Sequence, residues 1–254
     1  MISLFLDLDG TLIDLAESPG KVQVPRDLHT RLKMLEKHLH GTMAIASGRN
    51  IVTLDHLLYP YVGPAIGVHG IEIREGKSTI RKLNAPPLPE KLRAAIAVTV
   101  RAFSGAVLED KDVSIAVHYR HDAAMLLTLT EEIQSICDYV APAWRCLTGH
   151  NVVEVRPTGI DKGTGLIEMM KAEHFAHSIP VSVGDDTTDL DMFAAANRLG
   201  GLTISVGNRI AGKGDCHLAT PADVLQLLDK LIAESGNIDI SKVKGLVAGI
   251  SARP

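Results

Sequence analysis

The stretch LFLDLDGTL, residues 4–12, sets two carboxylates one residue apart directly after an apolar run. A continuous apolar run of this kind is typical of a strand buried on both faces of a parallel sheet. Two acids at the end of such a strand are unfavourable, because each charge loses water and repels its neighbour. Asp7 and Asp9 therefore require nearby cationic groups, which other parts of the sequence must supply.

Apolar runs alternate with helical patterns at both ends of the chain. Buried strands are expected within residues 2–6, 41–47, 179–185 and 202–207, and helices within residues 25–38, 50–58, 163–173, 190–197 and 222–234. This order predicts an α/β fold, a parallel sheet with helices on both faces. Ligands bind such sheets at the carboxyl ends of the strands. Three polar clusters follow the strands there: Asp7 with Asp9, residues 47–49, and Asp185 with Asp186.

The middle of the chain has a different pattern. A proline-rich break, NAPPLPEKL at residues 84–92, precedes a helix over about 89–103, strands near 106–120, a helix over about 121–139 and strands near 143–157. Apolar and polar side chains alternate along these strands, as expected of a sheet with one solvated face. Ile115 and Val117 share one face of the first strand pair, and Val153 and Val155 share one face of the second. We predict an inserted α+β domain at residues 85–156 within a core formed by residues 1–84 and 157–254.

Composition excludes several classes of protein. The formal net charge is −4, and no block of lysine and arginine occurs, so a nucleic-acid partner is not expected. The three cysteines are far apart and lack a CxxC pair, which indicates reduced thiols. The first residues lack a basic segment, and no apolar run is long enough to span a bilayer. We expect a cytoplasmic monomer with no membrane partner.

The pair Asp7 and Asp9 is suited to phosphoryl transfer. A calcium loop is excluded, because Leu12 and Ser18 stand where an EF-hand needs glycine and glutamate. A carboxylate at a strand end can attack phosphorus, and an acid two residues later shares its face and can protonate the leaving oxygen.

The cations that this chemistry needs have candidates elsewhere. Asp7, Asp185 and a backbone carbonyl offer the hard oxygen ligands that Mg²⁺ prefers. Lys162 could balance the nucleophile, and Ser47 with nearby backbone amides could hold phosphate oxygens. Each has a structural alternative: Asp185 and Asp186 as helix caps, Lys162 as a solvated lysine at a helix start, and Ser47 as a helix N-cap.

Two other patterns are set aside. GNRIAGKGD, residues 207–215, has the spacing of a nucleotide-binding P-loop, but Gly214 stands where a serine or threonine must bind Mg²⁺. His174 and His177 lie one helical turn apart without a third ligand, so we expect solvated histidines.

The segments DLDGTL, SGR, DKG and GDDTTD resemble, in this order, the four motifs of the haloacid dehalogenase (HAD) superfamily of phosphatases. GVHGIEIR (67–74), LEDKDVSIAVHYR (108–120), VVEVRPTGIDKG (152–163) and ANRLGG (196–201) are similar to trehalose-6-phosphate phosphatases. This resemblance covers the whole sequence except about the last 20 residues. It implies a HAD-like Rossmannoid core with a cap that closes over the disaccharide. It also implies Mg²⁺-dependent hydrolysis of trehalose 6-phosphate.

The resemblance also implies roles. Asp7 would form an aspartyl-phosphate, and Asp9 would protonate the leaving sugar oxygen and then deprotonate water. Ser47 and Lys162 would hold the phosphoryl group. Mg²⁺ would bind Asp7, the backbone carbonyl of Asp9, and Asp185, with Asp186 in support. The expected substrate-binding residues are Gly48, Arg49, Glu72, Glu109, Lys111, His118 and Arg120. One departure is Leu190, where the family usually has glutamate.

Three alternatives stay open. The substrate could be another sugar phosphate, or the enzyme could be a phosphomutase with the same core. A third possibility is a non-catalytic sugar-phosphate sensor, which the presence of Asp9 disfavours because a sensor needs no proton donor.

Overall fold

The computed structural model describes residues 1–16, 21–76, 79–83, 85–111, 113–119, 123–149 and 151–252. The chain divides into two compact units, and each has its own sheet. Unit 1 comprises Met1–Leu83 together with Asp161–Pro254, and unit 2 comprises Asn84–Ile160. Unit 2 is thus inserted into the sequence of unit 1.

Unit 1 is built on an eight-stranded sheet with the order β12-β11-β10-β1-β2-β3-β4-β5. Its strands are β1 (Ile2–Leu6), β2 (Met43–Ala46), β3 (Ala65–Gly67), β4 (Glu72–Arg74), β5 (Arg81–Lys82), β10 (Ile179–Gly184), β11 (Leu202–Val206) and β12 (Cys216–Leu218). The pairs from β12 through β3 are parallel, as the apolar runs predict, whereas β3–β4 and β4–β5 are antiparallel. The reversal follows from the connection, because the short turn η2 (Val68–Gly70) cannot make a parallel crossover.

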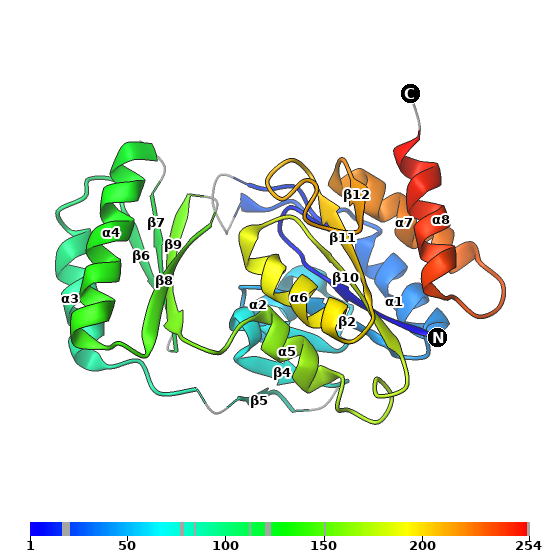
Figure 1. Cartoon of the computed structure of the whole chain (residues 1–254), viewed down its shortest axis with the longest axis horizontal. Helices are drawn as coiled ribbons and strands as arrows, with labels where there is room; N and C mark the ends of the chain where they lie inside the picture. The colour runs from blue at the N-terminus through cyan, green and yellow to red at the C-terminus, as the bar shows by residue number, and fades with distance from the viewer. Residues whose placement is uncertain are drawn as a thin grey trace. The chain divides into compact units, whose positions relative to one another are not determined.

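Helices cover both faces of this sheet (Figure 1). The helices α1 (Leu28–His38), α2 (Ile51–Leu58), α7 (Pro221–Ala233) and α8 (Ile240–Ser251) share the larger core cluster with Leu4 and Leu6. On the other face, α5 (Lys162–Met169) and α6 (Leu190–Arg198) share a second cluster with Phe5. Successive residues of β1 thus point to opposite faces, and both faces are buried. Helix α8 lies in a segment for which the sequence patterns predict no element.

Unit 2 contains a four-stranded antiparallel sheet with the order β6-β7-β9-β8. Its elements are α3 (Glu90–Val100), β6 (Val107–Asp110), β7 (Ile115–His118), α4 (Ala123–Val140), β8 (Trp144–Gly149) and β9 (Val152–Pro157). Both helices pack on one face of the sheet through a core that includes Ile115, Val117, Val153 and Val155. The four predicted residues therefore lie on the core face, but Ala116 and Arg156 on the opposite face are also buried, so that face is not solvated throughout. In the part of the chain that the structure describes, no helix is both long and apolar enough for a membrane span.

The central strands of unit 1 bring three loops to one edge of the sheet. Leu6 pairs with Val183 of β10 on one side and with Ile45 of β2 on the other, all in parallel register. The residues that follow these strands are therefore neighbours in space, although they are far apart in the sequence. This edge holds the acids of the opening motif.

Candidate active site

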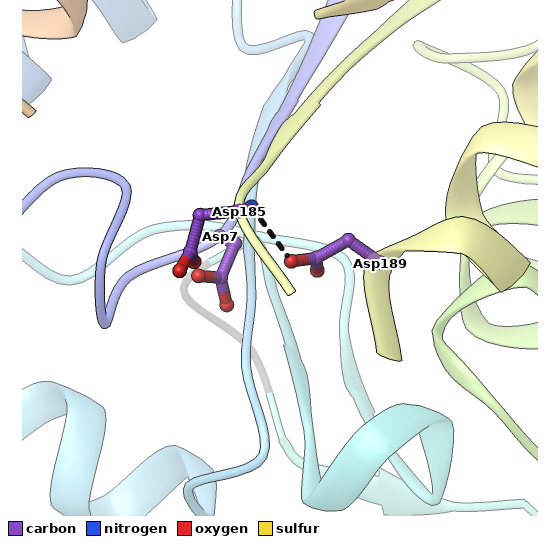
Figure 2. Close-up of side chains that lie close together, drawn as sticks. All are labelled: Asp7, Asp185 and Asp189. Atoms are coloured by element: carbon purple, nitrogen blue, oxygen red, sulfur yellow. Dashed lines mark hydrogen bonds between the residues drawn. The ribbon is translucent and has the colours of Figure 1, made fainter. Parts of the chain in front are cut away.

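Three buried carboxylates meet where β1 and β10 end (Figure 2). Asp7 follows β1, Asp185 follows β10, and Asp189 lies in the short turn η3 (Thr187–Asp189). One carboxylate oxygen of each lies within 4.8 Å of the others. Their exposed fractions are only 5%, 4% and 0%, so water screens the repulsion among them poorly.

Lys162, the first residue of α5, supplies a cation to this cluster. Its Nζ donates hydrogen bonds to Oδ1 of Asp7 at 2.6 Å and to Oδ1 of Asp189 at 2.7 Å. Burial lowers the pKa of Lys162, but the charges of Asp189 and Asp7 outweigh that effect and hold its pKa above the usual value. The lysine is 2% exposed, so the alternative of a solvated lysine is wrong.

Asp7 is the acid that burial affects most strongly. Burial raises its pKa well above the usual value, and the negative charges of Asp189 and Asp185 act in the same direction. Lys162 opposes this shift through its charge and its hydrogen bond. A further cation beside Asp7 would therefore favour the ionised carboxylate that a nucleophile needs.

Asp189 is a member of the cluster that sequence reasoning missed. Its Oδ2 accepts hydrogen bonds from the backbone N–H groups of Asp185 and Asp186, both at 3.0 Å. A side chain at Gly184 would collide with the carboxyl group of Asp189, since an added Cβ would lie 2.4 Å from its Cγ. The available signal was the capping-box spacing, in which Asp189 follows Asp186 by three residues.

Asp186 lies beside the cluster and caps the turn. Its Oδ1 accepts a hydrogen bond from the backbone N–H of Thr187 at 2.7 Å, so Asp186 caps η3, whereas the N-cap position of the helix at Leu190 is Asp189. Its Oδ2 forms an ion pair with Nη1 of Arg209 at 3.1 Å.

Asp185 has two side-chain donors. It accepts a hydrogen bond from Oγ1 of Thr11 at 3.2 Å and contacts the guanidinium of Arg209. Burial and the negative charge of Asp189 raise the pKa of Asp185 to about 6. Gly10, with φ of +89°, lets the loop after β1 approach this carboxylate, because an added Cβ would lie 2.2 Å from Oδ2 of Asp185.

Asp9 is held by Arg49 from the loop after β2. Nε and Nη2 of Arg49 donate to the two oxygens of Asp9, each at 2.7 Å, in the bidentate geometry that guanidinium and carboxylate groups favour. The sequence places Arg49 among the substrate-binding residues, and its pairing with Asp9 was not predicted.

Ser47 begins that same loop and is 1% exposed. Its Oγ accepts a hydrogen bond from the backbone N–H of Arg49 at 3.1 Å, whereas Asn50 is the N-cap of α2. The alternative of Ser47 as the N-cap is therefore wrong. Gly48 faces His69, since an added Cβ would lie 2.3 Å from Nε2 of His69.

The turn η2 is hydrogen-bonded to the loop after β2. The backbone N–H groups of Val68 and His69 donate to the carbonyls of Arg49 and Ser47, at 2.9 and 3.1 Å. Both residues have positive φ, 46° and 51°, which is unusual for side chains of this kind. Gly70 abuts the start of α5, because an added Cβ would lie 2.1 Å from the carbonyl oxygen of Asp161.

Glu72 on β4 lies next to the same loop. Its Oε2 accepts a hydrogen bond from the backbone N–H of Ile51 at 2.8 Å, at the N-terminus of α2. Arg74, two residues later on the same strand, forms a bidentate pair with Asp55 at 2.6 and 2.7 Å.

The remaining predicted substrate residues belong to unit 2. His118 and Glu109 are hydrogen-bonded at 2.9 Å, and this bond lowers the pKa of Glu109. Lys111 forms an ion pair with Glu154 at 3.3 Å. Arg120 lies outside the described residues.

Comparison with known proteins shows an extended similarity. The profile of the family described as Trehalose-phosphatase matches residues 5–216. A probable trehalose-phosphate phosphatase of Sinorhizobium fredii is 37% identical over 205 residues, 81% of this chain and 77% of the relative. A trehalose-6-phosphate phosphatase of Escherichia coli is 36% identical over 235 residues, 89% of this chain and 85% of the relative.

Solved structures show the same fold. The C-terminal domain of the trehalose-6-phosphate phosphatase of C. albicans superposes with a TM-score of 0.81 at 23% identity, covering 92% of this chain and 93% of that domain. A HAD-superfamily phosphatase of Bacteroides thetaiotaomicron superposes with a TM-score of 0.61 at 20% identity, covering 91% of this chain and 94% of that chain. The predicted HAD-like architecture is confirmed.

Proposed function

This chain belongs to the trehalose-phosphatase family of the HAD superfamily, and from that premise we propose that it hydrolyses trehalose 6-phosphate to trehalose and phosphate. As a member of this family, it is a phosphoric monoester hydrolase. The observation that carries the proposed mechanism is the buried pairing of Asp7 with Lys162 at the end of β1. This pairing holds a carboxylate in place at a buried position.

We propose that Asp7 attacks phosphorus and forms an aspartyl-phosphate. Lys162 lies 2.6 Å from Oδ1 of Asp7, which leaves the other oxygen of that carboxylate for the attack. The lysine offsets part of the charge on Asp7 and can donate to a phosphate oxygen. Ser47 and the backbone amides of the loop after β2 would hold the remaining phosphoryl oxygens.

Asp9 would carry the proton in both steps. It follows Asp7 by two residues and is held by both guanidinium nitrogens of Arg49, so its orientation is restricted. In the first step its carboxylic acid form protonates the sugar oxygen as the P–O bond breaks. In the second step its carboxylate takes a proton from the water that attacks the aspartyl-phosphate.

The donor set fits a hard divalent cation, and we propose Mg²⁺. The cluster contains three buried carboxylates, and Lys162 supplies a single positive charge between Asp7 and Asp189. Asp7, Asp185 and the backbone carbonyl of Asp9 would hold the ion, while Asp189 holds Lys162 and Asp186 caps the turn beside them. When bound, the cation neutralises charge on the phosphoryl oxygens.

For the sugar, we propose substrate-binding residues in each unit separately. The candidates are Gly48, Arg49 and Glu72 in unit 1, and Glu109, Lys111, His118 and Arg120 in unit 2. Paired donors and acceptors such as His118 with Glu109 suit the hydroxyl groups of a polyol. We further propose a cytoplasmic monomer, and the free thiols of Cys137, Cys146 and Cys216 support a reducing compartment.

A phosphate-release panel tests the proposal. Purified protein is incubated with trehalose 6-phosphate, glucose 6-phosphate and sucrose 6-phosphate, each with Mg²⁺ and with a chelator. We expect phosphate release from trehalose 6-phosphate with Mg²⁺ but not with the chelator. The Asp7→Asn variant should release no phosphate. Faster release from another sugar phosphate would reject the substrate, and an isomerised product without free phosphate would indicate a mutase.

A further inference from the structure

Arg209 contacts two acids of the site from a loop that the proposed mechanism does not use. It lies in the stretch 207–215, which has P-loop spacing but no serine or threonine at the metal position. Its Nη2 contacts Oδ2 of Asp185, and its Nη1 lies 3.1 Å from Oδ2 of Asp186. One guanidinium therefore joins the proposed metal ligand to the capping acid next to it.

The loop that carries Arg209 is anchored at both ends. At its far end, Oδ2 of Asp215 accepts hydrogen bonds from the backbone N–H and the hydroxyl of Thr203 on β11, at 2.9 and 2.8 Å. At its start, the backbone N–H of Gly207 donates to the carbonyl of Leu218 on β12 at 3.0 Å. Ile210, next to Arg209, is 2% exposed and fixes the middle of the loop. These contacts hold Arg209 beside the acids.

We propose that Arg209 is a positioning residue that neutralises Asp185 while no divalent cation is bound, and that it thereby sets the metal affinity of the site. This inference rests on the metal-dependent mechanism proposed above. It goes further, because it assigns to a particular arginine the control of how tightly the ion binds.

The distribution of charge supports this role. The ammonium of Lys162 is hydrogen-bonded to Asp7 and Asp189, and its charge acts on Asp185 more weakly than the charge of Arg209 does. Among the described residues, the ion-pair partner of Asp185 is Arg209. An arginine cannot give up its charge at ordinary pH, so a metal ion that binds Asp185 must displace the guanidinium or accept its repulsion.

Removal of this charge has opposite effects on the metal-free and metal-bound states. Without Arg209, the buried carboxylate of Asp185 has lost a counter-charge, which destabilises the metal-free protein. The same loss makes the site more negative and removes the competing cation, so a divalent ion binds more tightly. A residue with only a structural role would weaken metal binding when it is replaced.

Isothermal titration with Mg²⁺ in the absence of substrate tests the proposal. We expect the Arg209→Gln variant to bind Mg²⁺ about tenfold more tightly than the wild type, a screened fraction of the full interaction because Arg209 is 29% exposed. The melting temperature of the variant in chelator should be lower, and its rise with added Mg²⁺ should be larger. Lys213→Gln is the matched control, because it removes the same charge from an exposed position of the same loop.

Each outcome bears on the proposal. Equal or weaker Mg²⁺ binding by Arg209→Gln, with binding by the wild type, would overturn it and leave the proposed metal site intact. No Mg²⁺ binding by either protein would reject both the proposed metal site and the proposed role of Arg209. If Arg209→Gln does not fold, Arg209→Met decides: it also removes the charge but keeps a long unbranched side chain, so it must bind Mg²⁺ more tightly than the wild type.

Discussion

At the residue scale, Asp189 determines the orientation of the Lys162 ammonium. One oxygen of Asp189 accepts from Lys162, and the other accepts from the backbone N–H groups of Asp185 and Asp186. A completely buried carboxylate with all of these donors orients the ammonium toward Asp7 and fixes the loop that carries Asp185.

Asp189→Asn should therefore impair both stability and catalysis. The amide removes the charge that offsets the burial of Lys162, and its NH₂ group must face either the ammonium or the two backbone N–H groups, from which it cannot accept. We expect a loss of about 3 kcal/mol in the free energy of unfolding and a fall in kcat of at least about 100-fold. Urea denaturation and phosphate release measure these effects. Asp14→Asn, an exposed acid on the loop after β1, is the control that should change neither quantity.

The raised pKa of Asp185 predicts a pH-dependent stability in the absence of metal. Its pKa rises from 3.8 to about 6 on folding, so the folded state holds the proton more tightly than the unfolded state. The contribution of this group is therefore most favourable below about pH 4 and is lost as pH rises through about 6. In chelator at pH 7.5, Asp185→Asn should raise the free energy of unfolding by about 1–3 kcal/mol. The gain should disappear at pH 4 in the same denaturation series, and a gain that persists there would contradict this explanation.

At the element scale, the start of α5 positions Lys162. Oδ1 of Asp161 accepts from the backbone N–H of Thr164, and the hydroxyl of Thr164 accepts from the backbone N–H of Asp161, both at 2.8 Å. This capping box ends the preceding loop immediately before Lys162. Gly70 of η2 packs against the same turn, so the loop after β2 and the start of α5 are fixed together.

A pair of cap variants separates positioning from stability. Helix α7 begins with the same motif at Thr220 and Asp223, on a helix whose residues are not part of the proposed site. Asp161→Ala and Thr220→Ala should each cost about 1 kcal/mol of stability, measured by denaturation. Asp161→Ala alone should also lower kcat, by about tenfold, because Lys162 is the next residue. Equal kcat values for the two variants would show that the cap does not position the lysine.

At the scale of the whole molecule, two separate cores stabilise the two units. The core of unit 2 consists of α3, α4 and one face of its sheet, with residues such as Leu129, Ile133 and Val155. The clusters of unit 1 contain none of these residues. The units can therefore open independently, and a single free energy of unfolding need not describe both.

Ile133→Ala should loosen unit 2 alone. The side chain is fully buried, so its truncation leaves a cavity that costs about 2–5 kcal/mol. Hydrogen exchange measured by mass spectrometry should show faster exchange in peptides from residues 85–160 and unchanged exchange in β1 and β10. Leu227→Ala in α7 is the reciprocal control and should have the opposite pattern. Faster exchange throughout the chain in both variants would contradict the independence of the two cores.

Local patterns in the sequence were sufficient to predict the parallel core, the alternation in unit 2 and the edge where the acids gather. These features depend on periodicity and on the direction of strands, which a short window of sequence already contains. The antiparallel β4 and β5 and the helix α8 were less accessible, because short strands and a marginal helical pattern depend on the packing around them.

The sequence by itself therefore determined the class of fold, the family and the kind of chemistry. Only the tertiary structure decided which partners the charged groups take: Lys162 with Asp189, Arg49 with Asp9, and Arg209 with Asp185. The physical reason is the range of the interactions. Hydrophobic period and turn chemistry act over a few residues, whereas an ion pair between residues 24 to 40 positions apart forms only after strands and helices have packed.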